Sequence, residues 1–289
     1  MTKKNACLSI LAGAFLWGII GFFVKNLYSA GFTPMQVVAA RMLTAFLGLL
    51  IWIFCKDRRA LVIRPADCRY FVGTGVVSVM FFNYCLFRAI DESGVSIATI
   101  LLYTAPFFAI LFSRLLFGEA LTKIKIAALV FSILGCAFVA GALPAFQGVL
   151  SLSGHGFGVG AGFFYALYSI FGKYALRKYN AMTISLYTFL FATLVSVPFS
   201  GFSQWAPLLL HGKIALYVAG LGILSTILAF MLYTKGLEAI EAGRASIIAS
   251  VEPVVAAVMS FLVFGERLGP WQYFGIGLVI GSIVLLQGS

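Results

Sequence analysis

Long apolar stretches separated by short polar connections run along almost the whole chain. A transmembrane helix needs about 20 mainly apolar residues, and ten stretches of that kind can be placed. Turn-forming residues such as Gly94, Gly201 and Gly236 lie at the ends of these stretches or between them. The pattern therefore predicts an all-α membrane protein with ten transmembrane helices, at residues 7–28, 33–54, 69–88, 94–117, 124–142, 157–176, 182–201, 213–235, 243–264 and 270–287.

The second half of the chain is a diverged copy of the first. Residues 11–25 read LAGAFLWGIIGFFVK, and residues 159–173, which lie 148 positions later, read VGAGFFYALYSIFGK. Residues 105–119 (APFFAILFSRLLFGE) correspond to residues 252–266 (EPVVAAVMSFLVFGE) at an offset of 147. Two separate segments at nearly one offset indicate an internal duplication.

Each half of the chain contains five predicted spans, which is an odd number. The second copy is therefore expected to cross the membrane in the opposite direction. We expect two inverted five-helix repeats, residues 1–146 and 147–289, which together form one transport domain. This architecture is typical of alternating-access carriers, whose substrate site lies between the halves near the membrane midplane.

Composition and charge agree with a protein that lies almost entirely in the bilayer. The chain is 62% hydrophobic and only 10% charged, whereas about a quarter of a soluble protein is charged. The net charge of +11 does not point to a nucleic-acid partner, because about 14 basic residues fall in connections on one side and about 4 on the other. Positive charge marks the cytoplasmic side, so we expect a multi-pass protein of the cytoplasmic membrane with both termini in the cytoplasm.

The sequence contains no set of residues typical of an enzyme. The only histidines, His155 and His211, fall in connections expected on the outer side, and the five cysteines have no metal or redox spacing. No phosphate-binding loop is present. We therefore expect no enzymatic activity, no cofactor and no metal. A channel or a membrane scaffold remains an alternative, although neither explains the duplication.

Several motifs resemble the EamA-type carriers of the drug/metabolite transporter superfamily. They are the five-plus-five arrangement, the Gly-Glu ending of the fourth and ninth spans, the pair Glu252-Pro253 and the run AARMLTA around Arg41. The resemblance covers nearly the whole chain. It implies a secondary carrier of small organic metabolites, and it favours export of an amino acid or related compound. The expected partners are a small-molecule substrate and the lipid bilayer, and the expected state is a monomer or homodimer.

Polar aromatic side chains are expected deep inside the spans, where a tyrosine needs a hydrogen-bond partner. They could form an aromatic wall that stacks on flat ligands or holds quaternary cations, so a carrier of organic cations is the alternative function. Core packing is the other explanation for each aromatic residue. The predicted substrate-binding residues are Trp17, Asn83, Tyr84, Tyr103, Tyr165, Tyr168, Ser250 and Glu252.

Pro106 and Pro253 occupy equivalent positions of the two halves, in mid-span. A proline inside a helix removes a hydrogen bond and clashes with the preceding turn. Matched interruptions in the two halves of a carrier point to its site, so we predict hinges at both prolines. The nearby Ser246 and Ser250 share a helix face, which either lines a cavity or packs against another helix.

Glu252 is the only one of the nine carboxylates that is expected in the middle of a span. A charge at this depth is costly and is by default a functional candidate. It could couple transport to protons, bind the substrate, or form a structural pair with Arg41. On an ideal helix Glu252 lies about 160° from the serine face, so either the serines pack, the helix is unwound at Pro253, or Glu252 points at another span.

Lys25 and Lys173 end the two repeated segments and should lie near opposite membrane surfaces. They could belong to opposing gates of the carrier. The alternative is that each lysine only extends its amine to the membrane interface.

Overall fold

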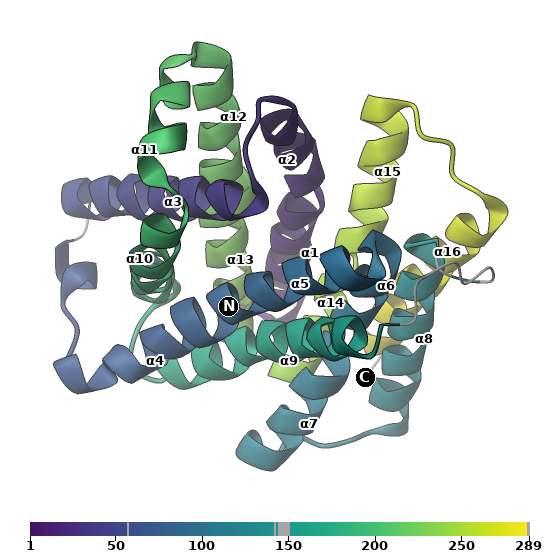
Figure 1. Cartoon of the computed structure of the whole chain (residues 1–289). Helices are drawn as coiled ribbons and strands as arrows, with labels where there is room; N and C mark the ends of the chain where they lie inside the picture. Colours follow the sequence, from purple (N-terminus) through teal and green to yellow (C-terminus); the bar gives the residue numbers. More distant parts are fainter. Residues whose placement is uncertain (57, 142, 144–150, 288–289) are drawn as a thin grey trace.

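The computed structural model describes residues 1–56, 58–141, 143 and 151–287, and the described part is helical with no strand (Figure 1). The helices of the first half are α1 (Lys3–Gly18), α2 (Ile20–Ser29), α3 (Pro34–Lys56), η1 (Arg58–Leu61), η2 (Pro65–Asp67), α4 (Cys68–Val72), η3 (Gly73–Met80), α5 (Phe81–Ser93), α6 (Val95–Leu102), α7 (Ala105–Phe117) and α8 (Lys123–Val139). Those of the second half are α9 (Leu152–Ala175), α10 (Ala181–Phe199), α11 (Phe202–Trp205), η4 (Ala206–Leu210), α12 (Gly212–Gly222), η5 (Ile223–Leu228), α13 (Ala229–Leu237), α14 (Ala242–Ala249), α15 (Glu252–Phe264) and α16 (Pro270–Gln287).

The prediction of an all-α membrane protein agrees with this structure. Seven helical stretches within the described residues are long and apolar enough to cross a membrane. The three remaining predicted spans correspond to α8, α9 and α16, so the count of ten transmembrane helices stays a prediction. The boundary predicted between residues 146 and 147 lies outside the described residues.

The two halves repeat each other's packing contacts. A Cβ atom added at Gly73 would meet the ring of Phe171, and one added at Gly220 would meet the ring of Phe23. The sequence offsets of 147 and 148 map the first of these contacts onto the second. The duplication seen in the sequence is therefore also present in the way the helices pack.

Helices of one half pack mainly on helices of the other. In the first half α1 contacts α13 and α15, and in the second half α9 contacts the corresponding α5 and α7. The helices α3 and α10 also contact each other. The buried core therefore lies between the halves, and neither half forms a separate globule.

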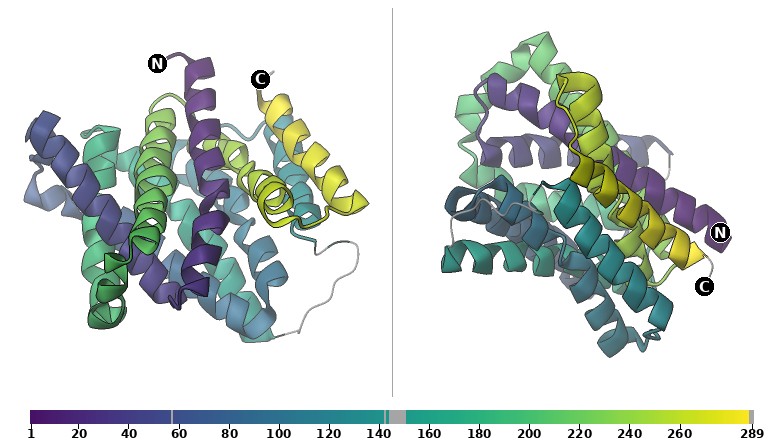
Figure 2. Two further views of the ribbon diagram at one scale, coloured as in Figure 1. Left: turned by 90° about the horizontal axis from the view of Figure 1, so that it is seen from above. Right: turned by 90° about the vertical axis from the view of Figure 1, so that its right-hand side faces the viewer.

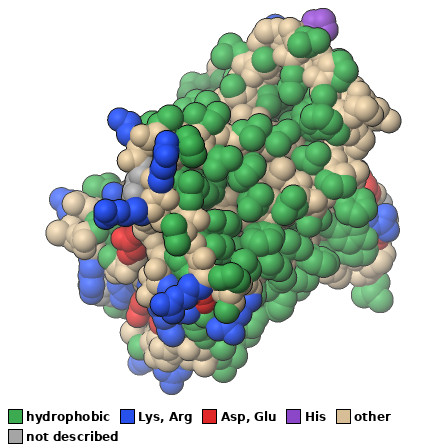
Figure 3. All heavy atoms as spheres, turned by 90° about the vertical axis from the view of Figure 1, so that its left-hand side faces the viewer, with side chains coloured by type: hydrophobic (Ala, Val, Ile, Leu, Met, Phe, Trp, Pro, Cys, Tyr) green, Lys and Arg blue, Asp and Glu red, His purple; other side chains and the backbone are tan. Residues whose placement is uncertain are grey.

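The surface is apolar over a wide area. Figure 3 shows hydrophobic side chains across most of one face, with Lys and Arg gathered toward one end. Ile51, Trp52 and Leu216 are examples of large apolar side chains that are exposed on the molecule. A soluble monomer rarely exposes an apolar patch of this extent, so the surface is suited to contact with lipid. Both views of Figure 2 place the start of α1 and the end of α16 on the same side of the molecule.

The helices α8 and α16 approach each other with their backbones almost in contact (Figure 2). A Cβ atom at Gly135 would lie 2.9 Å from the carbonyl oxygen of Gly275, and a Cβ atom at Gly275 would lie 2.7 Å from that of Gly135. Small residues allow this close approach, which membrane helices use for association in the absence of a hydrophobic driving force.

A larger side chain at this contact is expected to separate the two helices. Gly275→Leu should lower the free energy of unfolding by about 1–3 kcal/mol, as overpacking does elsewhere, and this should appear as a lower melting temperature in detergent. Gly277→Leu is the matched control, because Gly277 lies one half-turn away with nothing within 4 Å of its Cβ position. Equal melting temperatures for the two variants would contradict the close packing.

Candidate functional site

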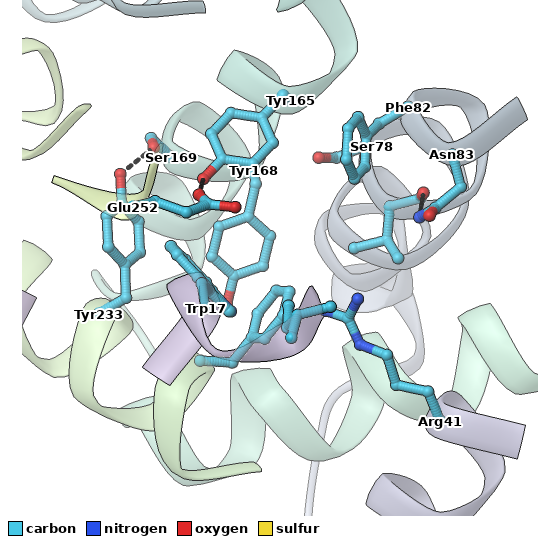
Figure 4. A pocket seen from close by; sticks show the side chains of 13 residues that line it. Trp17, Arg41, Ser78, Phe82, Asn83, Tyr165, Tyr168, Ser169, Tyr233 and Glu252 are labelled. Carbon is cyan, nitrogen blue, oxygen red and sulfur yellow. Dashed lines mark hydrogen bonds between the residues drawn. The ribbon is translucent and has the colours of Figure 1, made fainter. Parts of the chain in front are cut away.

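A cavity of about 70 Å³ lies between helices of both halves (Figure 4). It has room for several water molecules. Six of its thirteen lining residues are aromatic, and its other polar groups include hydroxyls, one amide and two side chains of opposite charge. The lining residues are Trp17, Ile20, Arg41, Ser78, Val79, Phe82, Asn83, Tyr165, Tyr168, Ser169, Phe230, Tyr233 and Glu252.

Equivalent positions of the two repeats meet in this cavity. Trp17 of α1 and Tyr165 of α9 are related by the offset of 148, and their ring centroids are 6.3 Å apart in an edge-to-face arrangement. Ile20 and Tyr168 are related in the same way and also line the cavity. The cavity is therefore formed where the two halves join, and not within either half.

Both proline-containing stretches are interrupted just before the proline. The first is broken at Tyr103 and Thr104, between α6 and α7, and the second at Ser250 and Val251, between α14 and α15. Pro106 and Pro253 then occupy the first turn of α7 and α15, a position that needs no backbone N–H donor. The structure has the matched interruptions that the sequence indicates, while a hinge motion at the prolines stays a prediction.

The interruption also explains how Ser250 and Glu252 face different surroundings. The Ser132 hydroxyl of α8 donates to the Ser250 hydroxyl over 2.8 Å, so this serine belongs to a packing contact. Glu252 begins α15 and lines the cavity. Of the three arrangements left open by the sequence, the helix is interrupted before Pro253 and Glu252 points at another helix, α9. Ser250 packs against α8, and it also lines a small cavity together with Ser246.

The Glu252 carboxylate accepts a hydrogen bond from the Tyr165 hydroxyl, with an oxygen–oxygen distance of 3.3 Å. Trp17 lies against the same group of rings, 5.0 Å from Tyr233 between centroids. The carboxylate is thus partly buried among aromatic side chains (Figure 4).

Arg41 reaches the cavity from α3 and is held by a different helix. Its Nε donates to the Thr226 hydroxyl over 2.8 Å, and the Thr226 hydroxyl in turn donates to the Leu221 carbonyl over 2.8 Å. The guanidinium lies 6.0 Å from the ring centroid of Phe230. Among the described residues no ion pair within 4.0 Å joins Arg41 to Glu252, so the direct structural pair considered from the sequence is not formed here.

Four of the other predicted binding residues line this cavity or a second one beside it. Asn83 and Tyr168 line the cavity, where Asn83 donates to the Val79 carbonyl over 2.7 Å and Tyr168 shares a 2.6 Å hydrogen bond with Thr234. Tyr103 and Ser250 line a smaller adjoining cavity of about 10 Å³, which also has Tyr165 and Glu252 in its wall.

Tyr84 lies outside both cavities, so the structure does not bring it together with the other predicted binding residues. Its side chain is 56% exposed and approaches Phe157, at 6.1 Å between ring centroids. Successive residues of a helix are rotated by about 100°, so α5 cannot direct both Asn83 and Tyr84 inward. Asn83 therefore lines the cavity, whereas Tyr84 lies on another face of the same helix.

Ser78, Phe82 and Phe230 also line the cavity, although they are not among the binding residues predicted from the sequence. Phenylalanine is so common here, at 29 residues, that no single one carries a signal. Ser78 lies in η3, a π-helical stretch whose counterpart in the second half is the π-helical η5. Such wider turns rotate the following residues and often occur at functional sites. Gly73 and Gly75 lie at the start of η3, and their counterparts Gly220 and Gly222 lie just before η5. These paired glycines are the feature of the sequence that could have pointed to the two π-helical stretches.

Charged groups gather where the loop before α8 meets the loop before α14. Lys125, which is 2% exposed, lies 2.8 Å from the Glu241 carboxylate and 3.9 Å from that of Glu119. Glu119 accepts a hydrogen bond from the Ala242 N–H over 3.1 Å, and burial raises the pKa of its carboxyl. Lys173 donates to the carbonyls of Leu237 and Ile240, over 2.7 and 2.6 Å.

Lys25, the counterpart of Lys173, has different surroundings. It forms an ion pair of 3.3 Å with Glu266, and the two side chains are 54% and 58% exposed. Its Nζ also lies 3.8 Å from the ring centroid of Phe264. Lys173 therefore binds backbone carbonyls after α13, whereas Lys25 forms a solvent-exposed ion pair with Glu266. A gating role for either lysine stays a prediction.

With this geometry established, comparison with known proteins identifies the family. The sequence model of the EamA-like transporter family matches residues 4–141 and 152–287. The chain belongs to this family, and the two matches agree with the internal duplication. Membership of a transporter family also agrees with the expectation that the protein is not an enzyme.

Relatives of the chain are transporters. An uncharacterized transporter of Archaeoglobus fulgidus is 26% identical over 96% of this chain and 94% of its own length. The threonine/homoserine exporter RhtA of Escherichia coli is 29% identical over 71% of this chain and 67% of its own length. A protein of known crystal structure has the same fold, with a TM-score of 0.81 and 17% identity over 99% of this chain and 97% of that one.

The charged cluster around Lys125 generates a prediction about stability. Lys125→Met would leave the buried Glu119 carboxylate without its nearby cation, whereas Glu241 would keep its ion pair of 3.2 Å with Arg244. Removing one partner of a buried pair costs about 3 kcal/mol or more. We expect a clearly lower melting temperature, while Lys123→Met, at an exposed position two residues away, should leave it unchanged. Glu119→Gln should cost less than Lys125→Met, since burial already disfavours the charged form of Glu119.

Proposed function

We propose that this chain is a secondary active transporter that works by alternating access and exports a small organic metabolite, an amino acid or a related compound, across the cytoplasmic membrane. The observation that carries the proposal is the cavity between the two halves, with an aromatic wall and the charged groups of Arg41 and Glu252.

The architecture supports a carrier. The family match is duplicated, the packing contacts of the two halves repeat, and both halves have a helix interrupted before a proline. Inverted repeats with broken helices around a central site are the usual construction of alternating-access carriers. In this proposal the ten helical stretches all cross the membrane, and residues 1–146 and 147–289 are threaded in opposite directions.

Two features favour an amino acid or a related compound. The cavity wall combines hydroxyl and amide groups with both signs of charge. One relative is a threonine/homoserine exporter. The predicted binding residues that remain in this proposal are Trp17, Asn83, Tyr165, Tyr168 and Glu252, with Tyr103 and Ser250 next to them.

A carrier of organic cations is the second candidate. Glu252 lies among aromatic rings, and cation–π attraction is worth about 0.5–2 kcal/mol for each ring. Arg41 on the same cavity is unfavourable for a ligand that carries only positive charge. A channel would show flux that does not saturate and no counterflow, and a scaffold would show no transport.

Proton coupling through Glu252 is part of the proposal. A carboxylate in the cavity can exchange a proton for a substrate, which would link export to the pH gradient. Transport with an unchanged rate and unchanged pH dependence in Glu252→Gln would end this part of the proposal, since glutamine keeps the shape but cannot ionise.

The proposed threading places both termini in the cytoplasm. Single cysteines introduced at Arg59 and Arg177, in a variant whose five native cysteines are replaced, should react with a membrane-impermeant thiol reagent only from the cytoplasmic side. A cysteine at Lys213 should react only from the other side. Labelling of positions 59 and 177 from opposite sides would show that the threading is wrong.

The direct test is counterflow into proteoliposomes loaded with amino acids, amines or nucleobases. We expect saturable uptake that is accelerated by the same amino acid on the inside. Tyr165→Phe removes the hydroxyl that donates to Glu252 and should raise KM about fivefold, the effect of one lost hydrogen bond. Tyr84→Phe is the control, since Tyr84 is exposed outside the cavity, and its KM should be unchanged.

A further inference from the structure

We propose that the cavity binds its substrate as a zwitterion in one fixed orientation, with the substrate carboxylate on Arg41 and its ammonium group on Glu252. This inference rests on the proposed function and assigns the polarity of the site. It makes Arg41 and Glu252 together the residues that determine specificity.

The repeat provides an internal comparison for both charges. An offset of 147 relates Gly73 to Gly220 and Gly75 to Gly222, and the structure shows that these glycines make corresponding close contacts. The same offset relates Arg41 to Thr188 and Glu252 to Ala105. Both counterparts are buried and uncharged. The fold therefore forms the same helix contacts without a charge at either position, and the charges have a use other than packing.

Arg41 is oriented but not saturated by the protein. The bond from its Nε to Thr226 fixes the plane of the guanidinium, and the Leu221 carbonyl fixes the Thr226 hydroxyl. Figure 4 shows the side chain reaching toward the centre of the cavity. Within the described residues, no hydrogen bond is recorded for its two terminal nitrogens. A guanidinium presents a planar set of donors that matches a carboxylate, so these nitrogens are suited to bind one.

Glu252 is held in a similar way on the other side. The Tyr165 hydroxyl donates one hydrogen bond to it, whereas an ionised carboxylate can accept about four. The rings of Trp17 and Tyr165 lie next to the carboxylate and would flank a bound ammonium group, which favours a cation. The carboxylate and the aromatic rings beside it are therefore suited to bind a primary amine.

The two charges do not neutralise each other directly, because no ion pair within 4.0 Å joins them in the described structure. In Figure 4 they enter the cavity from different helices. A ligand with a single charge would pair with either Arg41 or Glu252. The other of these two residues would then stay partly buried without an oppositely charged partner, which is unfavourable. A ligand with both charges satisfies both, so the cavity should reject simple cations and simple anions alike.

The first experiment uses the unmodified protein, so that it does not depend on the folding of a variant. Inhibition of counterflow is measured with L-threonine, with L-threoninamide, which keeps only the ammonium group, and with N-acetyl-L-threonine, which keeps only the carboxylate. We expect each single-charge analogue to bind about 10- to 100-fold more weakly than L-threonine, the range for a lost hydrogen bond to a charged group. Equal inhibition by L-threonine and L-threoninamide would overturn the inference.

The second experiment assigns each charge to its residue. Arg41→Met should reduce affinity for L-threonine while leaving that for L-threoninamide nearly unchanged, so the ratio of the two affinities falls toward one. Glu252→Gln should have the same effect on the ratio of L-threonine to N-acetyl-L-threonine. Arg114→Met is the control, because Arg114 is exposed at the end of α7, and both ratios should be retained. Arg41→Lys and Glu252→Asp, which keep the charges, serve where a neutral variant fails to fold.

The outcomes separate this inference from the proposed function. If amino acids exchange but the affinity ratios are unchanged in both variants, the carrier stands and the assigned polarity is wrong. If L-threoninamide or a quaternary amine is transported better than any amino acid, the organic-cation function holds and the inference fails with the amino-acid proposal. If no compound shows counterflow, the carrier proposal itself fails.

Discussion

The constraint on which the structure depends is that every backbone polar group within an apolar surrounding must find a partner. Continuous helices meet this requirement by themselves, and interruptions are tolerated where side chains or a cavity replace the missing bonds. At the first break the Thr104 hydroxyl donates to the Leu101 carbonyl over 2.6 Å. At the second break the Ser250 carbonyl is approached by the Cys136 thiol at 3.9 Å. The positions of the breaks therefore locate the polar centre of the molecule.

Duplication gives this centre two related walls, and divergence makes them different. Trp17 and Tyr165 are counterparts that both remained aromatic and lie in contact. Arg41 and Glu252 have the uncharged counterparts Thr188 and Ala105. A repeated scaffold thus supplies the cavity and the interruptions, while substitutions in single copies supply its charge. This division explains why a shared fold shows little about substrate, as the 17% identity to a protein with the same fold illustrates.

The sequence was informative where a signal was repeated or periodic. The apolar stretches predicted the helices, the paired prolines predicted the interruptions, and the repeat brought Trp17 and Tyr165 together. It failed where the result depends on helix rotation. Tyr84 faces outward beside an inward Asn83, and the π-helical η3 turns Ser78 toward the cavity. The sequence could not show whether Arg41 and Glu252 touch, because this depends on the angle between α3 and α15 and on the Thr226 hydroxyl that holds the arginine.

The ion pair Lys25–Glu266 and the cluster around Lys125 differ in how much free energy it costs to separate their charges. This difference affects how the proposed carrier would open on either side of the membrane. An exposed ion pair such as Lys25–Glu266 contributes about 0–1 kcal/mol and can open at little cost. Lys125 is buried between Glu119 and Glu241, so separating these groups without water would expose uncompensated charge in an apolar surrounding. If the carrier opens at the end that holds Lys125, water must therefore reach this lysine. The loop before α8 and the loop before α14 would then move apart from each other in one step. The Ala242 N–H that donates to Glu119 joins these loops directly, so a movement of α14 and α15 would be transmitted to the Lys125 cluster.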